Sequence, residues 1–140
     1  MDVNRIKEFA ARDQFANLIG AVVETVSDRE VVCTLDINEK HLNAGGVVQG
    51  GVIFTLADFA LALACNADDL SAGNGAISLS QSGSIIFFRP ARGGRLTART
   101  SLLQKGRQIS VYRMTVTDHQ GAAVAEMTAN ACRVTRSPGP

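Results

Sequence analysis

Residues 49–65 read QGGVIFTLADFALALAC, the most apolar run in the chain. From Val52 to Cys65 only Thr55 and Asp58 interrupt the apolar residues, and several alanines favour helix. These fourteen residues are fewer than the roughly 20 that a helix needs to span a bilayer. The run therefore predicts a helix buried inside the protein. Because such a helix is apolar on every face, it must be covered on every side.

The rest of the chain is typical of strands joined by short turns. Two strands are expected before the helix and four after it, and short turns between long strands imply antiparallel hairpins. The expected strands are residues 19–25, 30–37, 76–88, 95–104, 108–118 and 122–134. Together they predict one α+β domain over residues 1–140, a curved and largely antiparallel sheet wrapped around one long buried helix.

The two ends of this domain carry smaller elements. Residues 3–16 predict a short amphipathic helix, and residues 136–140, rich in proline and glycine, predict a frayed tail. Asp68 and Asp69 follow the apolar run and are expected to be solvated residues at the end of the helix.

Composition excludes several classes of function. A net charge of +1 argues against a nucleic-acid binder, which normally has a basic face. The N-terminus has no apolar signal region, and no segment suits a membrane, so we expect a cytoplasmic protein. Cys33, Cys65 and Cys132 form no metal-binding pattern and are expected to be small buried residues.

The low charge content also suggests a subunit interface. Charged residues make up 19% of the chain, against about 25% in a typical soluble domain, while 46% of the residues are hydrophobic. In a chain of 140 residues this excess of apolar side chains indicates a second buried surface, most simply between subunits.

Asp58 and the glycines before it are the residues that suggest chemistry. An acid inside an apolar helix costs several kcal/mol unless it is paired, hydrogen-bonded or protonated. It is therefore either a structural acid tied to the backbone or to an arginine, or a general base or nucleophile. At the start of the helix, Gly50 and Gly51 leave free backbone N–H groups that can stabilise an oxyanion.

The spacing of these two features predicts a dimer. Gly51 and Asp58 lie on similar faces of one helix but about 10 Å apart along its axis. One reacting carbonyl needs both groups within roughly 3–3.5 Å. If both residues act in one reaction, Asp58 of one copy must meet Gly51 of a second copy at the interface.

These segments resemble the hotdog-fold acyl-CoA thioesterases, and among them the phenylacetate-degradation type. The similar segments are residues 41–58, which contain HLNAG and QGGVIFTLAD, residues 88–96 (FRPARGGRL), and residues 106–107. The resemblance extends over most of the chain, from about residue 15 to residue 134. It implies a hotdog fold and a homodimer, with dimers paired into a homotetramer.

The resemblance also implies roles for individual residues. Asp58 matches the catalytic carboxylate, Gly51 the N–H of the oxyanion hole, and Asn43 an asparagine that orients water or the thioester. Gln49 stands where the family usually has histidine, and its amide can donate a hydrogen bond but cannot carry a proton. The implied reaction is hydrolysis of an aryl or medium-chain acyl-CoA, without metal or cofactor, with Asp58 as base or nucleophile.

Further residues are expected to contact the substrate. Cations at or beside turns could bind the phosphates of coenzyme A, with ordinary solvated charge as the alternative. The expected substrate-binding residues are Gly50, His41, Arg89 and Arg107, with Arg92 and Lys105 as further cations. Two other functions stay open: an acyl-CoA-binding protein without turnover, and a hydratase or dehydratase, which would usually need a histidine beside the acid.

Overall fold

The apolar run lies within one long helix, α3 (Gly50–Ala72), in the computed structural model, which describes residues 1–135. The helix is longer than expected, because residues 66–72 continue it to Gly73. Gly73 has the left-handed φ of 64° that ends a helix at little cost in a residue without Cβ. Asp68 and Asp69 thus lie in the last turns of α3, where Asp68 is exposed as expected and Asp69 is partly buried.

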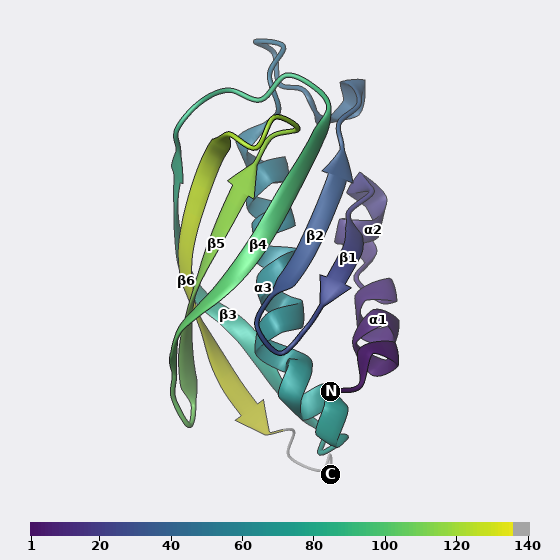
Figure 1. The fold of residues 1–140 in the computed structure, drawn as a ribbon, viewed down its shortest axis with the longest axis vertical. Helices are drawn as coiled ribbons and strands as arrows, with labels where there is room; N and C mark the ends of the chain where they lie inside the picture. The colour runs from purple at the N-terminus through teal and green to yellow at the C-terminus, as the bar shows by residue number, and fades with distance from the viewer. Residues whose placement is uncertain (136–140) are drawn as a thin grey trace.

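A six-stranded antiparallel sheet curves around α3, as Figure 1 shows. The strand order is β1-β2-β4-β5-β6-β3, so β1 and β3 are the two edges. The strands are β1 (Val22–Val26), β2 (Val31–Asp36), β3 (Ala76–Phe87), β4 (Arg95–Lys105), β5 (Ile109–Thr117) and β6 (Ala123–Thr135). The predicted α+β architecture is confirmed, and the four strands after the helix agree with prediction to within a residue or two.

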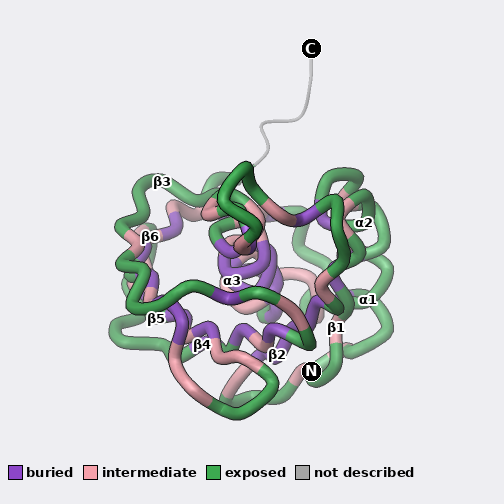
Figure 2. The backbone as a smooth tube through the Cα atoms, turned by 90° about the horizontal axis from the view of Figure 1, so that it is seen from above, coloured by how far each residue is buried: buried purple, intermediate pink, exposed green. Residues whose placement is uncertain are grey.

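The core lies between α3 and the inner face of the sheet. In Figure 2 the helix forms a buried centre with the strands around it. Leu56, Leu61 and Leu63 of α3 are almost fully buried, as are Leu35, Leu96, Met114 and Met127 of the sheet. Each such side chain contributes about 1.5–3 kcal/mol by leaving water. By length and composition alone α3 could cross a membrane, although half of its most apolar window is buried in this fold.

The N-terminal segment forms two helices, and the single helix predicted over residues 3–16 is wrong. These are α1 (Val3–Ala11) and α2 (Gln14–Ile19). Asp13 starts the second helix, because its carboxylate accepts a hydrogen bond from the N–H of Ala16 at 2.9 Å. Helix α2 takes up Ile19, so β1 begins three residues later than expected, at Val22. The tail predicted over residues 136–140 lies outside the described residues.

Asn66 fixes α3 against the edge strand β3. It is 1% exposed, and its side-chain amide pairs with the backbone of Ser78. The Ser78 N–H donates to Asn66 Oδ1 at 2.7 Å, and Asn66 Nδ2 donates to the Ser78 carbonyl at 2.9 Å. A buried amide is stable only when its polar atoms are bonded, so this pair sets where β3 lies along the helix.

Candidate active site at the start of helix α3

The loop before α3 is shaped by Asn43. Its side-chain oxygen accepts hydrogen bonds from the N–H groups of Gly45 at 2.9 Å and Val47 at 3.3 Å. Its backbone N–H donates to the Val47 carbonyl at 2.8 Å. The Val48 N–H donates to the Ala91 carbonyl at 2.7 Å, which ties this loop to the one after β3. The Asn43 oxygen thus holds the loop, and its exposed amide nitrogen is the part that can face a ligand.

Gln49 caps the first turn of α3. Its side-chain oxygen accepts a hydrogen bond from the Gly51 N–H at 2.5 Å, and both residues are exposed. The Gly51 N–H has no partner within the helix because it lies in the first turn. The capping oxygen of Gln49 therefore occupies the acceptor position of this N–H, and another acceptor could reach the N–H only by displacing it.

Asp58 lies two turns further along α3 and faces the edge strand β3. The Ser80 hydroxyl donates to Asp58 Oδ1 at 2.6 Å. Asp58 is half-buried in the single chain, with less burial than its apolar neighbours had suggested. Its sequence neighbours Ala57 and Phe59 are buried on other faces of the helix, whereas Asp58 stays partly exposed next to β3. The hydroxyl partner orients one carboxylate oxygen and leaves the other free.

A bulge in β3 brings Ser80 to Asp58. The pairing of β3 with β6 shifts between Ser80 and Ser82, so that Gln81 is an extra residue. Ser80 lies opposite Ala131 before the bulge, and Gly83 lies opposite Ala129 after it. Both alanines are buried, so the bulge moves the inward face from even to odd positions. Sequence reasoning missed Ser80, because a polar residue in a strand gives no sign of a bulge.

His41 and Gly50 have local structural roles. His41 is 4% exposed, its Nδ1 accepts from the Asn38 N–H at 3.0 Å, and its Nε2 lies 2.7 Å from the Ile19 carbonyl, to which it can donate. With both nitrogens engaged inside the chain, the structure does not support the predicted substrate contact of His41. A Cβ at Gly50 would lie 3.1 Å from the Phe87 ring, so this glycine allows close packing at the start of α3.

The predicted phosphate-binding cations are far apart within one chain. Arg89 is exposed in the loop after β3, whose Ala91 bonds to Val48 before α3. Arg107 is exposed in the β4–β5 turn, at the end of the molecule where α3 finishes (Figure 1). Its neighbour Lys105 forms an ion pair with Asp68 there. Arg89, together with Arg92 of the same loop, therefore lies at the same end as Gly51 in its own chain, whereas Lys105 and Arg107 lie at the other end.

The edge strand β3 is exposed beside this site. One side of β3 pairs with β6, and no other strand within residues 1–135 covers its second side. Several large apolar side chains on or next to it are also exposed, namely Leu79, Ile86, Phe87 and Phe88, together with Phe54 of α3. A long uncovered edge with apolar side chains is a surface to which another strand can add.

The site offers carboxylate, hydroxyl, amide and backbone N–H groups. Within residues 1–135, no group of three His, Cys, Asp or Glu side chains is placed to hold a metal ion. These groups can polarise a carbonyl through N–H donors and supply a carboxylate base or nucleophile. In one helix, however, Gly51 and Asp58 are about 10 Å apart, since each residue adds about 1.5 Å.

Known proteins that resemble this chain share its fold and belong to one family. Residues 45–125 match the family model of the thioesterase superfamily. The chain is 31% identical to the acyl-coenzyme A thioesterase PaaI of Escherichia coli over 114 residues, which are 81% of this chain and 77% of that protein. The structure of E. coli PaaI, from the phenylacetic acid degradation operon, is similar with a TM-score of 0.86 at 26% identity, covering 96% of this chain and 94% of that one.

A second solved structure is similar as well. The TT0310 protein of Thermus thermophilus matches with a TM-score of 0.78 at 31% identity, covering 88% of this chain and 99% of that one. These likenesses confirm the hotdog fold that the sequence resemblance implied.

Proposed function

The chain belongs to the thioesterase superfamily, and from this membership we propose that it hydrolyses an acyl-coenzyme A thioester to a carboxylic acid and coenzyme A. Family membership makes it a thioester hydrolase. The observation that carries the finer proposal is the pairing of Asp58 with Ser80 beside the edge strand β3, on the helix whose first turn offers the Gly51 N–H. The proposed acyl group is an aryl or medium-chain group.

In the proposed reaction the Gly51 N–H binds the thioester oxygen after Gln49 has turned away. The positive end of the helix dipole and this N–H stabilise the negative charge that develops on the oxygen. The amide nitrogen of Gln49 can then donate to the same oxygen. Asn43 is proposed to orient the water or the thioester with its side-chain amide nitrogen.

Asp58 is proposed to activate the attack on the carbonyl carbon. As a base, its carboxylate takes a proton from water while the water oxygen bonds to the carbonyl carbon; the C–S bond then breaks, and the coenzyme A thiolate takes up a proton. As a nucleophile, a carboxylate oxygen bonds to the carbonyl carbon and the C–S bond breaks, releasing the coenzyme A thiolate, which takes up a proton; water then hydrolyses the resulting mixed anhydride to the product acid and free Asp58. In both routes the Ser80 hydroxyl holds the carboxylate in position.

We propose further that the working unit is a homodimer joined along β3. The separation of about 10 Å between Gly51 and Asp58 of one helix argues that the two groups act from different subunits. The uncovered edge of β3 and the exposed Phe54 and Phe87 support this edge as the interface. The resemblance also implies a tetramer of paired dimers, which the mass from sedimentation would reveal.

The test is thiol release from a panel of aryl- and alkyl-coenzyme A thioesters. We expect the wild-type chain to release free thiol, and Asp58→Asn to lower kcat by about 10²–10⁴-fold with an unchanged circular dichroism spectrum. Absence of thiol release over the whole panel would refute the proposal. Binding without turnover would favour the acyl-CoA-binding alternative, and loss of enoyl-coenzyme A absorbance without thiol release would favour a hydratase.

A further inference from the structure

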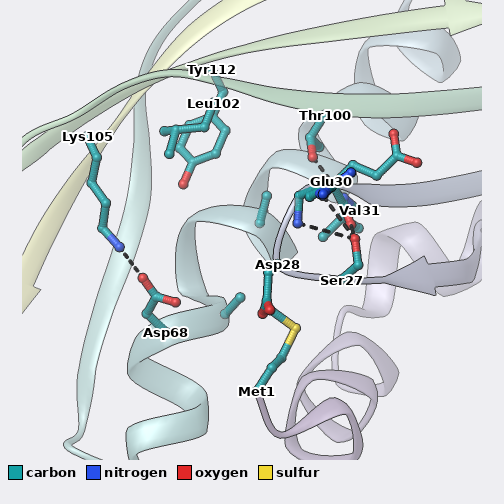
Figure 3. Close-up of a pocket in the computed structure, with 13 residues that line it drawn as sticks. Met1, Ser27, Asp28, Glu30, Val31, Asp68, Thr100, Leu102, Lys105 and Tyr112 are labelled. Carbon is teal, nitrogen blue, oxygen red and sulfur yellow. Dashed lines mark hydrogen bonds and ion pairs between the residues drawn. The ribbon is translucent and has the colours of Figure 1, made fainter.

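A cavity of about 350 Å³ lies beneath the β1–β2 turn, against the C-terminal half of α3 (Figure 3). Ala64 and Ala67 of the helix line it. These residues follow Asp58 by six and nine positions, which at about 100° per residue turns them roughly 120° and 180° away from Asp58 around the helix axis. The cavity is therefore separate from the candidate active site.

Tyr112 of β5 places a polar group in this cavity. The residue is only 8% exposed, and Figure 3 shows its hydroxyl directed into the space beside Leu102 and Lys105. No residue within 1–135 makes a hydrogen bond to that hydroxyl. Burial raises the pKa of Tyr112 to about 12, so the hydroxyl is a neutral donor at physiological pH. Within residues 1–135 no fully buried side-chain polar atom lacks a hydrogen-bond partner, so this hydroxyl keeps some contact with solvent inside the cavity. A molecule that fills the cavity would exclude that solvent and could accept the hydrogen bond of the hydroxyl in its place.

The remaining walls determine what can enter. Ala64, Ala67, Val31 and Leu102 supply apolar surface, and the small side chains of the two alanines leave the space open. The volume is at the lower end of the range for small-molecule pockets, about 300–1,000 Å³. A cavity of roughly 150 Å³ already accommodates a benzene ring. One ring or a short aliphatic body with a polar substituent therefore fits.

Two ion pairs lie at the rim of the cavity. Lys105 pairs with Asp68 across the opening, as Figure 3 shows, and Glu30 pairs with Arg99 at 3.3 Å. Asp28 and Arg29, the other charged side chains of the rim, form no ion pair within residues 1–135. Beside the Tyr112 hydroxyl, however, the charges of Lys105 and Asp68 are paired with each other, so a charged ligand there would lose its hydration without gaining a free partner.

We propose that this cavity is a binding site for a compact, uncharged molecule with an apolar body and one hydrogen-bond acceptor that meets the Tyr112 hydroxyl. The site is independent of the proposed hydrolysis, because it shares no residue with the site around Gly51 and Asp58. Such a ligand would bind while the thioester site is free or occupied.

The chain provides its own reporter for the test. Tyr112 is the only tyrosine and there is no tryptophan, so intrinsic fluorescence above 300 nm arises from this one ring. Cyclohexanone is a suitable probe, since it is uncharged, apolar in its body and carries one carbonyl acceptor. We expect saturable quenching of the wild-type fluorescence by cyclohexanone, and none by cyclohexanecarboxylate, which has a similar body and a negative charge.

Variants test whether the probe binds in this cavity or elsewhere on the protein. Affinities measured by ligand-observed NMR should fall about 2- to 10-fold for Tyr112→Phe, which removes only the hydroxyl. Ala64→Leu, which fills the cavity, should abolish binding, and Asp58→Asn should leave it unchanged. Linear, non-saturating quenching would overturn the proposal. So would equal affinity in Tyr112→Phe, unaltered binding in folded Ala64→Leu, or loss of binding in Asp58→Asn.

Discussion

The carboxylate of Asp58 in the candidate site is held by a hydroxyl group and not by a charged side chain. Asp58 has a neutral hydroxyl partner, Ser80, which orients the carboxylate and adds no opposite charge to it. A full ion pair would compete with water or a thioester for the same oxygens. A single hydroxyl donor leaves the second oxygen, Oδ2, free to act as base or nucleophile.

Ser80 is expected to be a positioning residue. In Ser80→Ala the carboxylate loses its donor, so we predict a kcat about 10-fold lower, because a hydrogen bond to a charged group is worth about 1.5–3 kcal/mol. Steady-state thiol release should show KM nearly unchanged. The matched control is Ser82→Ala, since Ser82 bonds to Asn130 and not to Asp58. Equal losses of kcat in the two variants would contradict a specific role for Ser80.

Gln49 is expected to control access to the Gly51 N–H. In Gln49→Glu a carboxylate would hold this N–H more firmly and place negative charge beside the developing oxyanion. We therefore predict that Gln49→Glu lowers kcat/KM at least about 10-fold more than Gln49→Ala does, since charge-assisted hydrogen bonds are roughly twice as strong as neutral ones. The measurement is the thiol-release kinetics of both folded variants. Similar kcat/KM values for Gln49→Glu and Gln49→Ala would contradict the proposed control of access to the Gly51 N–H.

At the scale of elements, two different contacts join the C-terminal half of α3 to the sheet. Asn66 pairs with the Ser78 backbone, and three residues later Asp69 pairs with Arg133 of β6 at 2.8 Å. The Asp69 side chain is only 12% exposed. The sequence had suggested a solvated acid, but β6 runs back past the last turn of α3 and supplies the guanidinium.

This pair predicts a loss of stability in acid. The hydrogen bond from Arg133 lowers the pKa of Asp69, helped by the Asn74 amide. The unfolded chain takes up this proton near the ordinary carboxyl pKa of about 3.9, whereas the folded chain does so only at lower pH. The stabilisation is therefore present above that pKa and is lost as the pH falls through the lowered pKa of the folded state.

Urea unfolding at pH 7 and pH 3 tests this prediction. Asp69→Asn should be less stable than the wild type at pH 7, and the difference should narrow at pH 3, where protonation of Asp69 in the unfolded chain reduces the stabilisation. Asp68→Asn is the matched control, because Asp68 forms an exposed pair with Lys105 that contributes little. A difference that stays constant between the two pH values would contradict the role assigned to Asp69.

At the scale of the whole molecule, the uncovered edge of β3 and the separation of Gly51 from Asp58 lead to the same assembly. One chain has both groups but cannot bring its own pair to one carbonyl. A twofold dimer along β3 would form two equivalent sites, each with a residue from either subunit.

Mixed dimers test whether the sites are shared. Asp58→Asn removes the carboxylate, and Gly51→Pro removes the N–H, with proline tolerated in the first turn of a helix. Each variant alone should be inactive. Refolded together in equal amounts, they should regain about a quarter of the wild-type activity, because half of the dimers are mixed and each mixed dimer has one intact site. If both groups acted within one chain, mixing would restore nothing.

The sequence alone was sufficient for the fold class, because periodicity and turn residues report local structure directly. The apolar run over 52–65, the four strands after it and the acid within the run all lie where the pattern placed them. Local spacing along a helix also gave the distance between Gly51 and Asp58 and thus the expectation of a dimer.

Only the tertiary structure could decide which groups meet across the chain. Ser80 reaches Asp58 because a bulge changes the face of β3, and His41 is engaged because Asn38 and Ile19 fold around it. Asp69 meets Arg133, and Arg89 is separated from Arg107, through the path of the sheet around α3. These contacts join residues that are distant in sequence. A shift of one residue in the pairing of two strands would turn their side chains to the other face of the sheet, so local sequence patterns do not predict which residues meet.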